Sequence, residues 1–139
     1  ITDIRELIHG SRTENWSSII MNGLLLNPNA PITGKAYGYG IYTARDFNKS
    51  FGYTNFHGSR WANGEGNTGY IGVYDTAYGK PYFPKGVGDY QKEVEKGGYN
   101  CLDAIASYSG FCMDEIVFYR EEALCIKYLI EFSEKNKEE

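Results

Sequence analysis

The pattern of apolar and polar positions along the chain predicts several short strands separated by long loops. Apolar side chains alternate from Leu124 through Ile126, Tyr128, Ile130 and Phe132, which predicts a strand with these five residues on one face. Four other runs have the length and the β-branched or aromatic content of strands: 5–9, 40–43, 70–78 and 115–119. The polar residues 120–123 separate the last two strands and predict that they form an antiparallel hairpin.

Two short helices complete the predicted elements. Residues 15–22 follow Thr13, a suitable N-cap, and precede Gly23, a suitable terminator. The second helix is expected at 46–53. Loops are expected at 27–40, 54–69 and 83–113, where glycine, proline and polar residues gather. Short strands, few helices and long loops indicate one α+β domain over residues 1–139, with a charged, frayed tail from about 133.

The composition adds a binding cleft to this picture. The chain has 139 residues, enough for one domain with its own core. It contains 17 glycines and 13 tyrosines, and the glycines follow no repeat period. Many turns next to aromatic surfaces favour a cleft built from loops. No apolar run approaches the length of a membrane span, so we expect no membrane partner.

The charge is distributed unevenly. The chain carries 14 basic and 18 acidic residues, for a net charge of −4, and its first 60 residues are mildly positive. There is no dense basic stripe, so direct binding of nucleic acid is not expected. The positive half favours a small anionic ligand, and an uneven scatter of surface charges explains it equally well.

The cysteines indicate an intracellular protein without a metal site. Cys101, Cys112 and Cys125 are odd in number and far from His9 and His57. They form neither a disulfide framework nor a zinc pattern, so we expect reduced thiols. The chain opens without a basic and then apolar leader, so no targeting signal is visible, and we expect an excised domain whose N-terminal partner domains are missing.

One literal motif match is excluded by its context. Residues 64–69 fit the dinucleotide-binding pattern GxGxxG. That motif requires a strand before it and a helix after it, so that phosphate lies at the helix N-terminus. Here a polar loop precedes the match and a strand follows it.

The sequence His-Gly-Ser-Arg occurs twice, at 9–12 and 57–60. His9 follows the apolar Leu7-Ile8 at a strand end, where loops present ligand groups from a rigid base. His57 lies in a glycine- and asparagine-rich loop. Taken alone, either histidine is more often a hydrogen-bonded structural residue than a ligand, and His9 is the better candidate.

Tyrosines and one carboxylate give two further candidate features. Tyr37, Tyr39, Tyr42 and Tyr53 suit a planar cationic ring, and a half-buried aromatic edge of the core is the alternative. Glu115 opens an otherwise apolar strand. Its carboxylate lies either exposed at the rim or in a cleft that alters its pKa.

Taken together, these motifs resemble the catalytic domain of poly(ADP-ribose) polymerases. The matching segments follow the family's order along the chain: 9–13 (HGSRT), 23–24 (GL), 30–34 (APITG), 37–42 (YGYGIY), 48–53 (NKSFGY), 115–119 (EIVFY) and 126–129 (IKYL). The resemblance covers nearly the whole chain and is weakest between 83 and 113. It implies the ADP-ribosyltransferase fold, with two packed, mainly antiparallel sheets around an NAD⁺ cleft.

The resemblance also implies the site residues. The family's His-Tyr-Glu triad falls on His9, Tyr42 and Glu115. Gly10 would hold the nicotinamide carboxamide through its backbone, with Ser50 adding a hydrogen bond and Tyr53 stacking on the ring. The full set implied to contact NAD⁺ is His9, Gly10, Ser11, Asn15, Gly40, Tyr42, Ala44, Lys49, Ser50 and Tyr53.

The function implied is transfer of ADP-ribose from NAD⁺ to protein acceptors, including the protein itself, with release of nicotinamide and without a metal. Glu115 and Lys49 favour polymer formation. The stretch from Tyr82 to Glu115 is short for the family, which trims the loop that helps bind the acceptor and leaves single transfer open. Tyr39 stands where the best-known members carry lysine, a departure that concerns the adenine side of the site and loop packing. The other functions left open are a non-catalytic module that binds NAD⁺ or ADP-ribose and an NAD⁺ glycohydrolase.

Overall fold

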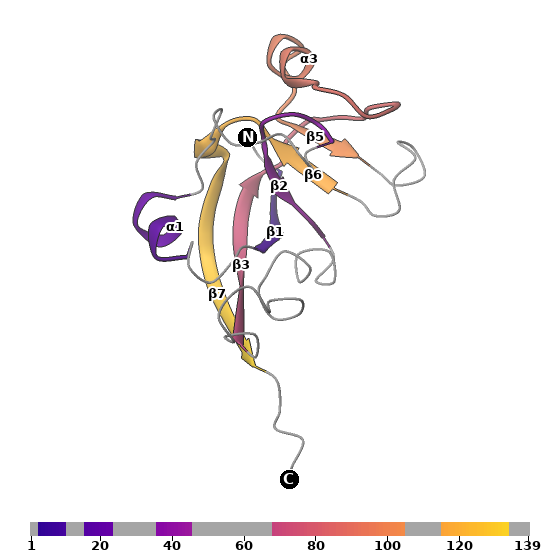
Figure 1. Ribbon diagram of the computed structural model, residues 1–139. Helices are drawn as coiled ribbons and strands as arrows, with labels where there is room; N and C mark the ends of the chain where they lie inside the picture. Colours follow the sequence, from indigo (N-terminus) through magenta and orange to yellow (C-terminus); the bar gives the residue numbers. More distant parts are fainter. Residues whose placement is uncertain (1–2, 11–15, 24–35, 46–67, 105–114, 134–139) are drawn as a thin grey trace.

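Two mainly antiparallel sheets and a few short helices make up the fold (Figure 1). The structure is a computed structural model that describes residues 3–10, 16–23, 36–45, 68–104 and 115–133. The α+β class predicted from the sequence is confirmed. In this described part of the chain, no helix is long and apolar enough to cross a membrane.

The three-stranded sheet has the strand order β1-β3-β7 and is antiparallel throughout. Its strands are β1 (Ile4–Gly10), β3 (Thr68–Ala77) and β7 (Leu124–Ser133). β3 lies in the centre and pairs on both sides, so its backbone hydrogen bonds are used along nearly all of its length. His9, near the end of β1, pairs with Gly72 of β3.

The four-stranded sheet has the order β2-β6-β5-β4. Its strands are β2 (Ile41–Thr43), β4 (Pro81–Tyr82), β5 (Cys101–Ala104) and β6 (Glu115–Phe118). Only the short β4–β5 pair is parallel among these strands. Every residue of β5 and β6 is buried, so both faces of this sheet are covered at its centre.

The two sheets are joined where β1 meets the end of β2. Ile8 and Ala44 form an antiparallel bridge, with each N–H donating to the other residue's carbonyl oxygen at 2.9 Å. This bridge fixes the strand that carries His9 beside the strand that carries Tyr42.

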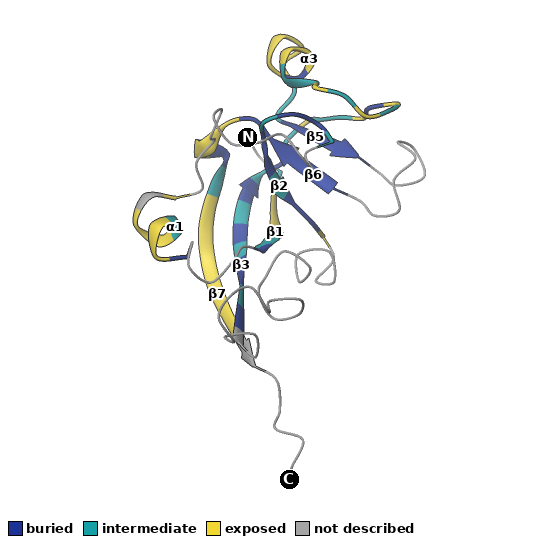
Figure 2. Ribbon diagram, in the orientation of Figure 1, coloured by how far each residue is buried: buried dark blue, intermediate teal, exposed yellow. Residues whose placement is uncertain are grey.

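Apolar side chains pack on both faces of the four-stranded sheet. The cluster between the sheets includes Leu7, Ile41, Tyr74 and Ile116, together with Trp16 of α1 (Trp16–Asn22). The cluster on the opposite face is covered by the short helix α3 (Gln91–Lys96), whose Val94 is buried. Figure 2 shows that burial is highest along β5 and β6, whereas β7 is exposed along much of its length.

Helix α1 agrees with the prediction of a helix at 15–22. Gly23 follows it with φ +79°, a conformation that glycine adopts without strain, and its N–H donates to the carbonyl of Ile19 at 2.7 Å. The strands expected at 5–9, 40–43, 70–78 and 115–119 are also present within two residues at each end.

The predicted hairpin between the last two strands is wrong. β6 pairs with β2 and β5, whereas β7 pairs with β3 in the other sheet. The 3₁₀ turn η2 (Glu121–Ala123) carries the chain from one sheet to the other. β6 is apolar after Glu115 and is buried on both faces, so it requires a central position that a terminal hairpin would not provide.

The single apolar face predicted for the last strand is also wrong. The β3–β7 register shifts between Val73 and Tyr74, so that Ile126 lies opposite Tyr74 and Tyr128 opposite Val73. Adjacent strand residues point to opposite faces, and therefore Ile126 and Tyr128 do too. Lys127 is the extra residue at this bulge.

The segment 83–113, predicted as a loop, contains α3 and β5. β5 was missed because Asp103 interrupts its apolar pattern. The helix expected at 46–53 and the residues beyond 133 lie outside the described part of the chain.

Candidate active site

His9 is fixed by a hydrogen bond between the sheets. Its Nδ1 lies 2.8 Å from the carbonyl oxygen of Tyr42. Because a carbonyl oxygen only accepts, this contact requires a hydrogen on Nδ1. In the neutral ring Nε2 then carries no hydrogen, so it can accept a hydrogen bond from a ribose hydroxyl.

Two aromatic rings hold the imidazole of His9 edge-on. The ring centroid of Trp16 lies 6.3 Å away at an interplanar angle of 74°, and that of Tyr74 lies 6.4 Å away at 87°. Both side chains are almost fully buried. Helix α1 and strand β3 thus both restrict the orientation of His9.

Tyr42 lies on β2, and its hydroxyl organises the turn before that strand. The hydroxyl donates to the carbonyl of Gly38 at 2.9 Å and accepts from the backbone N–H of Tyr37 at 2.8 Å. Gly38 has φ +84°, which favours glycine. A Cβ at Gly40 would lie 2.4 Å from Cγ1 of Val117, so the chain passes too close to β6 for any side chain there.

Glu115 is the first residue of β6 and is only 5% exposed. This burial excludes the alternative of a carboxylate exposed at the rim. Tyr42 pairs with Val117 across the β2–β6 ladder. Because Glu115 precedes Val117 by two residues, Glu115 and Tyr42 lie on the same face of the sheet.

A hydrogen bond ties the imidazole of His9 to the backbone of Tyr42, and the strand register places the side chains of Tyr42 and Glu115 on one face of the four-stranded sheet. Gly10 ends β1 and is buried, as are Gly40 and Ala44. The remaining candidates lie outside the described residues: Ser11, Asn15, Lys49, Ser50 and Tyr53. Of the tyrosine cluster, Tyr37 is fully buried core, whereas Tyr42 is half-buried.

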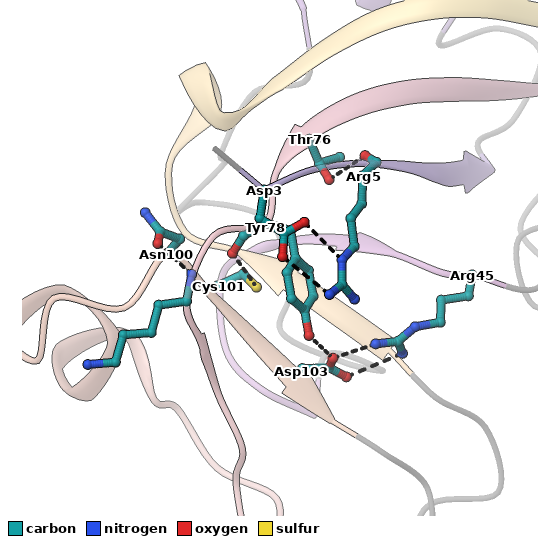
Figure 3. Close-up of polar contacts among 9 residues, drawn as sticks. Asp3, Arg5, Arg45, Thr76, Tyr78, Asn100, Cys101 and Asp103 are labelled. Carbon is teal, nitrogen blue, oxygen red and sulfur yellow. Dashed lines mark hydrogen bonds and ion pairs between the residues drawn. The ribbon is translucent and has the colours of Figure 1, made fainter. Parts of the chain in front are cut away.

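The sequence analysis missed a polar cluster that surrounds a buried carboxylate of the four-stranded sheet (Figure 3). The carboxylate of Asp103 on β5 accepts hydrogen bonds from the hydroxyl of Tyr78 and from the guanidinium of Arg45. The guanidinium of Arg5 lies 3.8 Å from the ring centroid of Tyr78. An acidic residue inside the apolar run 101–104 is the sequence signal that could have revealed the cluster.

The surroundings of this cluster keep its neutral groups protonated. Burial, together with the hydrogen bond to Asp103, raises the pKa of Tyr78, so its hydroxyl remains a donor. Burial and the nearby Asp103 raise the pKa of the Cys101 thiol to about 12. Of the cysteines that the structure describes, Cys101 and Cys125 are both free thiols. Among the described residues, no group of three or more His, Cys, Asp or Glu side chains could hold a metal ion.

Comparison with known proteins identifies the family of the chain. Residues 2–62 match the poly(ADP-ribose) polymerase catalytic domain. The chain is 30% identical over 135 residues to the putative poly [ADP-ribose] polymerase-like 100L of invertebrate iridescent virus 6, covering 91% of this chain and 69% of that protein.

Two longer relatives match over a smaller region. Poly [ADP-ribose] polymerase 2 of Arabidopsis thaliana is 39% identical over 74 residues, or 52% of this chain and 11% of that protein. The mouse protein mono-ADP-ribosyltransferase PARP8 is 43% identical over 51 residues, or 35% and 6%. The chain thus spans about two thirds of its viral relative and a small part of these two.

These matches place the chain in the class of NAD⁺ ADP-ribosyltransferases. The chain belongs to the poly(ADP-ribose) polymerase family, as the catalytic domain of that family.

Proposed function

We propose that this chain transfers ADP-ribose from NAD⁺ to protein acceptors, including itself, and that Glu115 is its catalytic carboxylate. The observation that carries the proposal is the buried Glu115 on the face it shares with Tyr42, which is hydrogen-bonded through its carbonyl to His9. One carboxylate is sufficient for this chemistry. Nicotinamide in NAD⁺ is already cationic, so it leaves without a general acid.

The reaction breaks the bond between nicotinamide and ribose, and the electron pair leaves with the nicotinamide nitrogen. Positive charge then develops on the ribose, as in glycoside hydrolysis. The carboxylate of Glu115 stabilises that charge, and a nucleophilic atom of the acceptor forms the new bond to ribose while its proton is released. Fixed charges of this kind contribute on the order of 10²–10³ in rate.

The binding roles follow the two ends of NAD⁺. We propose that Gly10 binds the nicotinamide carboxamide through its backbone and that Tyr42 covers the ring, with Ser50 and Tyr53 completing this end. His9, with Ser11 and Asn15, would meet the adenosine half. A ring fixed on several sides leaves along one line, which lowers the entropic part of the barrier.

Polymer formation is the extent of transfer that we propose, because the resemblance assigns to Glu115 and Lys49 the positions that favour it. Single transfer is the competing outcome, and the names of the relatives include both polymerases and a mono-ADP-ribosyltransferase. The intracellular location, the independence from metal and the absence of direct nucleic-acid binding stay predictions.

Incubation of the protein with NAD⁺ labelled in its adenylate phosphate tests the proposal. We expect nicotinamide release together with label bound to protein, and mass spectrometry of the modified protein would give the acceptor residue and the chain length. Free ADP-ribose without labelled protein would favour an NAD⁺ glycohydrolase. Binding of NAD⁺ or ADP-ribose with no nicotinamide release would favour a non-catalytic module.

A further inference from the structure

We infer that the ion pair between Arg45 and Asp103 positions Glu115 by fixing strand β6 from its other face. This inference rests on the proposed role of Glu115 and goes beyond it. Arg45 and Asp103 are positioning residues in this account, because they act through the strand and not on the substrate.

The strand order places the ion pair across β6. β6 lies between β2 and β5. Ile116, the residue after Glu115, pairs with Thr43 of β2 on one side and with Asp103 of β5 on the other. Arg45 follows Thr43 by two residues, and its guanidinium reaches the carboxylate of Asp103 with contacts of 2.5 Å and 3.3 Å. The pair therefore spans β6 at the residue next to Glu115. Figure 3 shows the guanidinium of Arg45 reaching the carboxylate of Asp103.

The ion pair and Glu115 lie on opposite faces of the sheet. Glu115 pairs with Ala104, the neighbour of Asp103, and adjacent strand residues point to opposite sides. The pair thus does not lie on the face of Glu115. A shift of β6 would have to break the ion pair between Arg45 and Asp103 on the opposite face of the sheet.

Two further contacts restrain the same segment. The hydroxyl of Thr43 donates to the carbonyl of Ile116 at 2.8 Å. The hydroxyl of Tyr78, which follows β3 of the other sheet, donates to Asp103. The carboxylate of Asp103 therefore joins both sheets at the level of Glu115.

Burial indicates what the ion pair contributes. Asp103 is 1% exposed and Arg45 is 38% exposed. Burial removes hydration from the carboxylate of Asp103, and its attraction to the partly exposed guanidinium of Arg45 offsets this cost without a large net gain in stability. The bidentate geometry of the pair does fix the relative position of two groups, which a catalytic carboxylate requires.

A kinetic double-mutant cycle tests the inference. Asp103→Asn, which keeps the shape of the side chain and removes its charge, should lower kcat roughly 10-fold or more, since small misplacements of a catalytic group are costly. The KM for NAD⁺ should stay within about twofold. In a Glu115→Gln background the same substitution should have no further effect on kcat, because it acts through the missing carboxylate.

Two other variants keep the test decisive. Arg45→Lys retains the charge and removes the two-pronged contact, and it replaces Asp103→Asn in the cycle if that variant fails to fold. Lys127→Met is the matched control. It removes the ion pair between Lys127 and Glu6, which belongs to the three-stranded sheet and not to the sheet that contains β6. The kcat of this variant should equal that of the wild type.

Equal losses of kcat with and without Glu115 would overturn the inference and leave the proposed function intact. A raised KM at unchanged kcat would overturn it as well. Failure of the proposed function is a different result: the wild type itself would release no nicotinamide, and the inference would then fall with it.

Discussion

Gly72 lies directly opposite His9 in the β1–β3 ladder, and its missing side chain makes room for the two rings that hold the imidazole. A Cβ at Gly72 would lie 2.7 Å from Cη2 of Trp16 and 2.7 Å from Cε1 of Tyr74. Both rings would have to move. The position of His9 therefore depends on a small residue on the neighbouring strand.

Gly72→Ala should weaken NAD⁺ binding and destabilise the fold. The methyl group displaces Trp16 or Tyr74, and overpacking of this kind costs about 1–3 kcal/mol. Calorimetric titration with NAD⁺ and urea unfolding would measure the two effects. Gly86→Ala is the matched control, because a Cβ there meets no atom within 4 Å. A Gly72→Ala variant that binds NAD⁺ as well as the Gly86→Ala variant would contradict the account of His9.

Tyr42→Phe should destabilise the protein by about 1–3 kcal/mol, because the backbone N–H of the fully buried Tyr37 loses the hydroxyl as its acceptor. The phenyl ring stays, so NAD⁺ binding should fall less than in Tyr42→Ala. Urea unfolding measures the first effect. Tyr128→Phe, with a side chain 58% exposed, should unfold like the wild type. An unchanged midpoint for Tyr42→Phe would show that its hydroxyl does not hold the turn.

The buried thiol of Cys101 predicts a loss of stability at high pH. Its pKa is raised from 9.0 to about 12 in the folded protein, chiefly by burial. The contribution of this thiol to the free energy of unfolding is therefore complete below pH 9. It is lost as the pH rises from 9 toward 12, because in that range the thiol ionises only in the unfolded chain. Over that range, wild type should lose about 1.4 kcal/mol per pH unit more than Cys101→Ala.

Unfolding curves of both proteins at pH 7 and pH 10 would measure this difference. The buried tyrosines titrate in both proteins, so the comparison isolates the thiol. Parallel loss of stability in the two proteins would show that the thiol ionises as readily in the folded state.

Local patterns predicted most strands and α1, because their apolar content and terminators are read from neighbouring residues. The same local patterns do not predict which strands pair with each other. Nothing near β6 and β7 shows that they belong to different sheets, since this depends on β6 being buried on both faces by distant elements. The bulge at Lys127 likewise depends on the register with β3, which no short window contains.

The candidate site was likewise predictable only in part from the sequence. His9, Tyr42 and Glu115 could be named because each stands in a motif of the family. The Arg45–Asp103 pair could not, since its residues are 58 apart along the chain and meet only when β2 and β5 flank β6. The edge-on contacts of Trp16 and Tyr74 with His9 also arise from the packing of α1 on β3.

Comparison of Glu115→Gln with the wild type tests the central claim most directly. Glu115→Gln should bind NAD⁺ with a Kd within about twofold of the wild type and release nicotinamide roughly 10²-fold or more slowly, because the amide keeps the shape of the side chain and loses its charge. Glu131→Gln, an exposed carboxylate on β7, should release nicotinamide at the wild-type rate. Equal rates for Glu115→Gln and the wild type would contradict the assignment of Glu115 as the catalytic carboxylate.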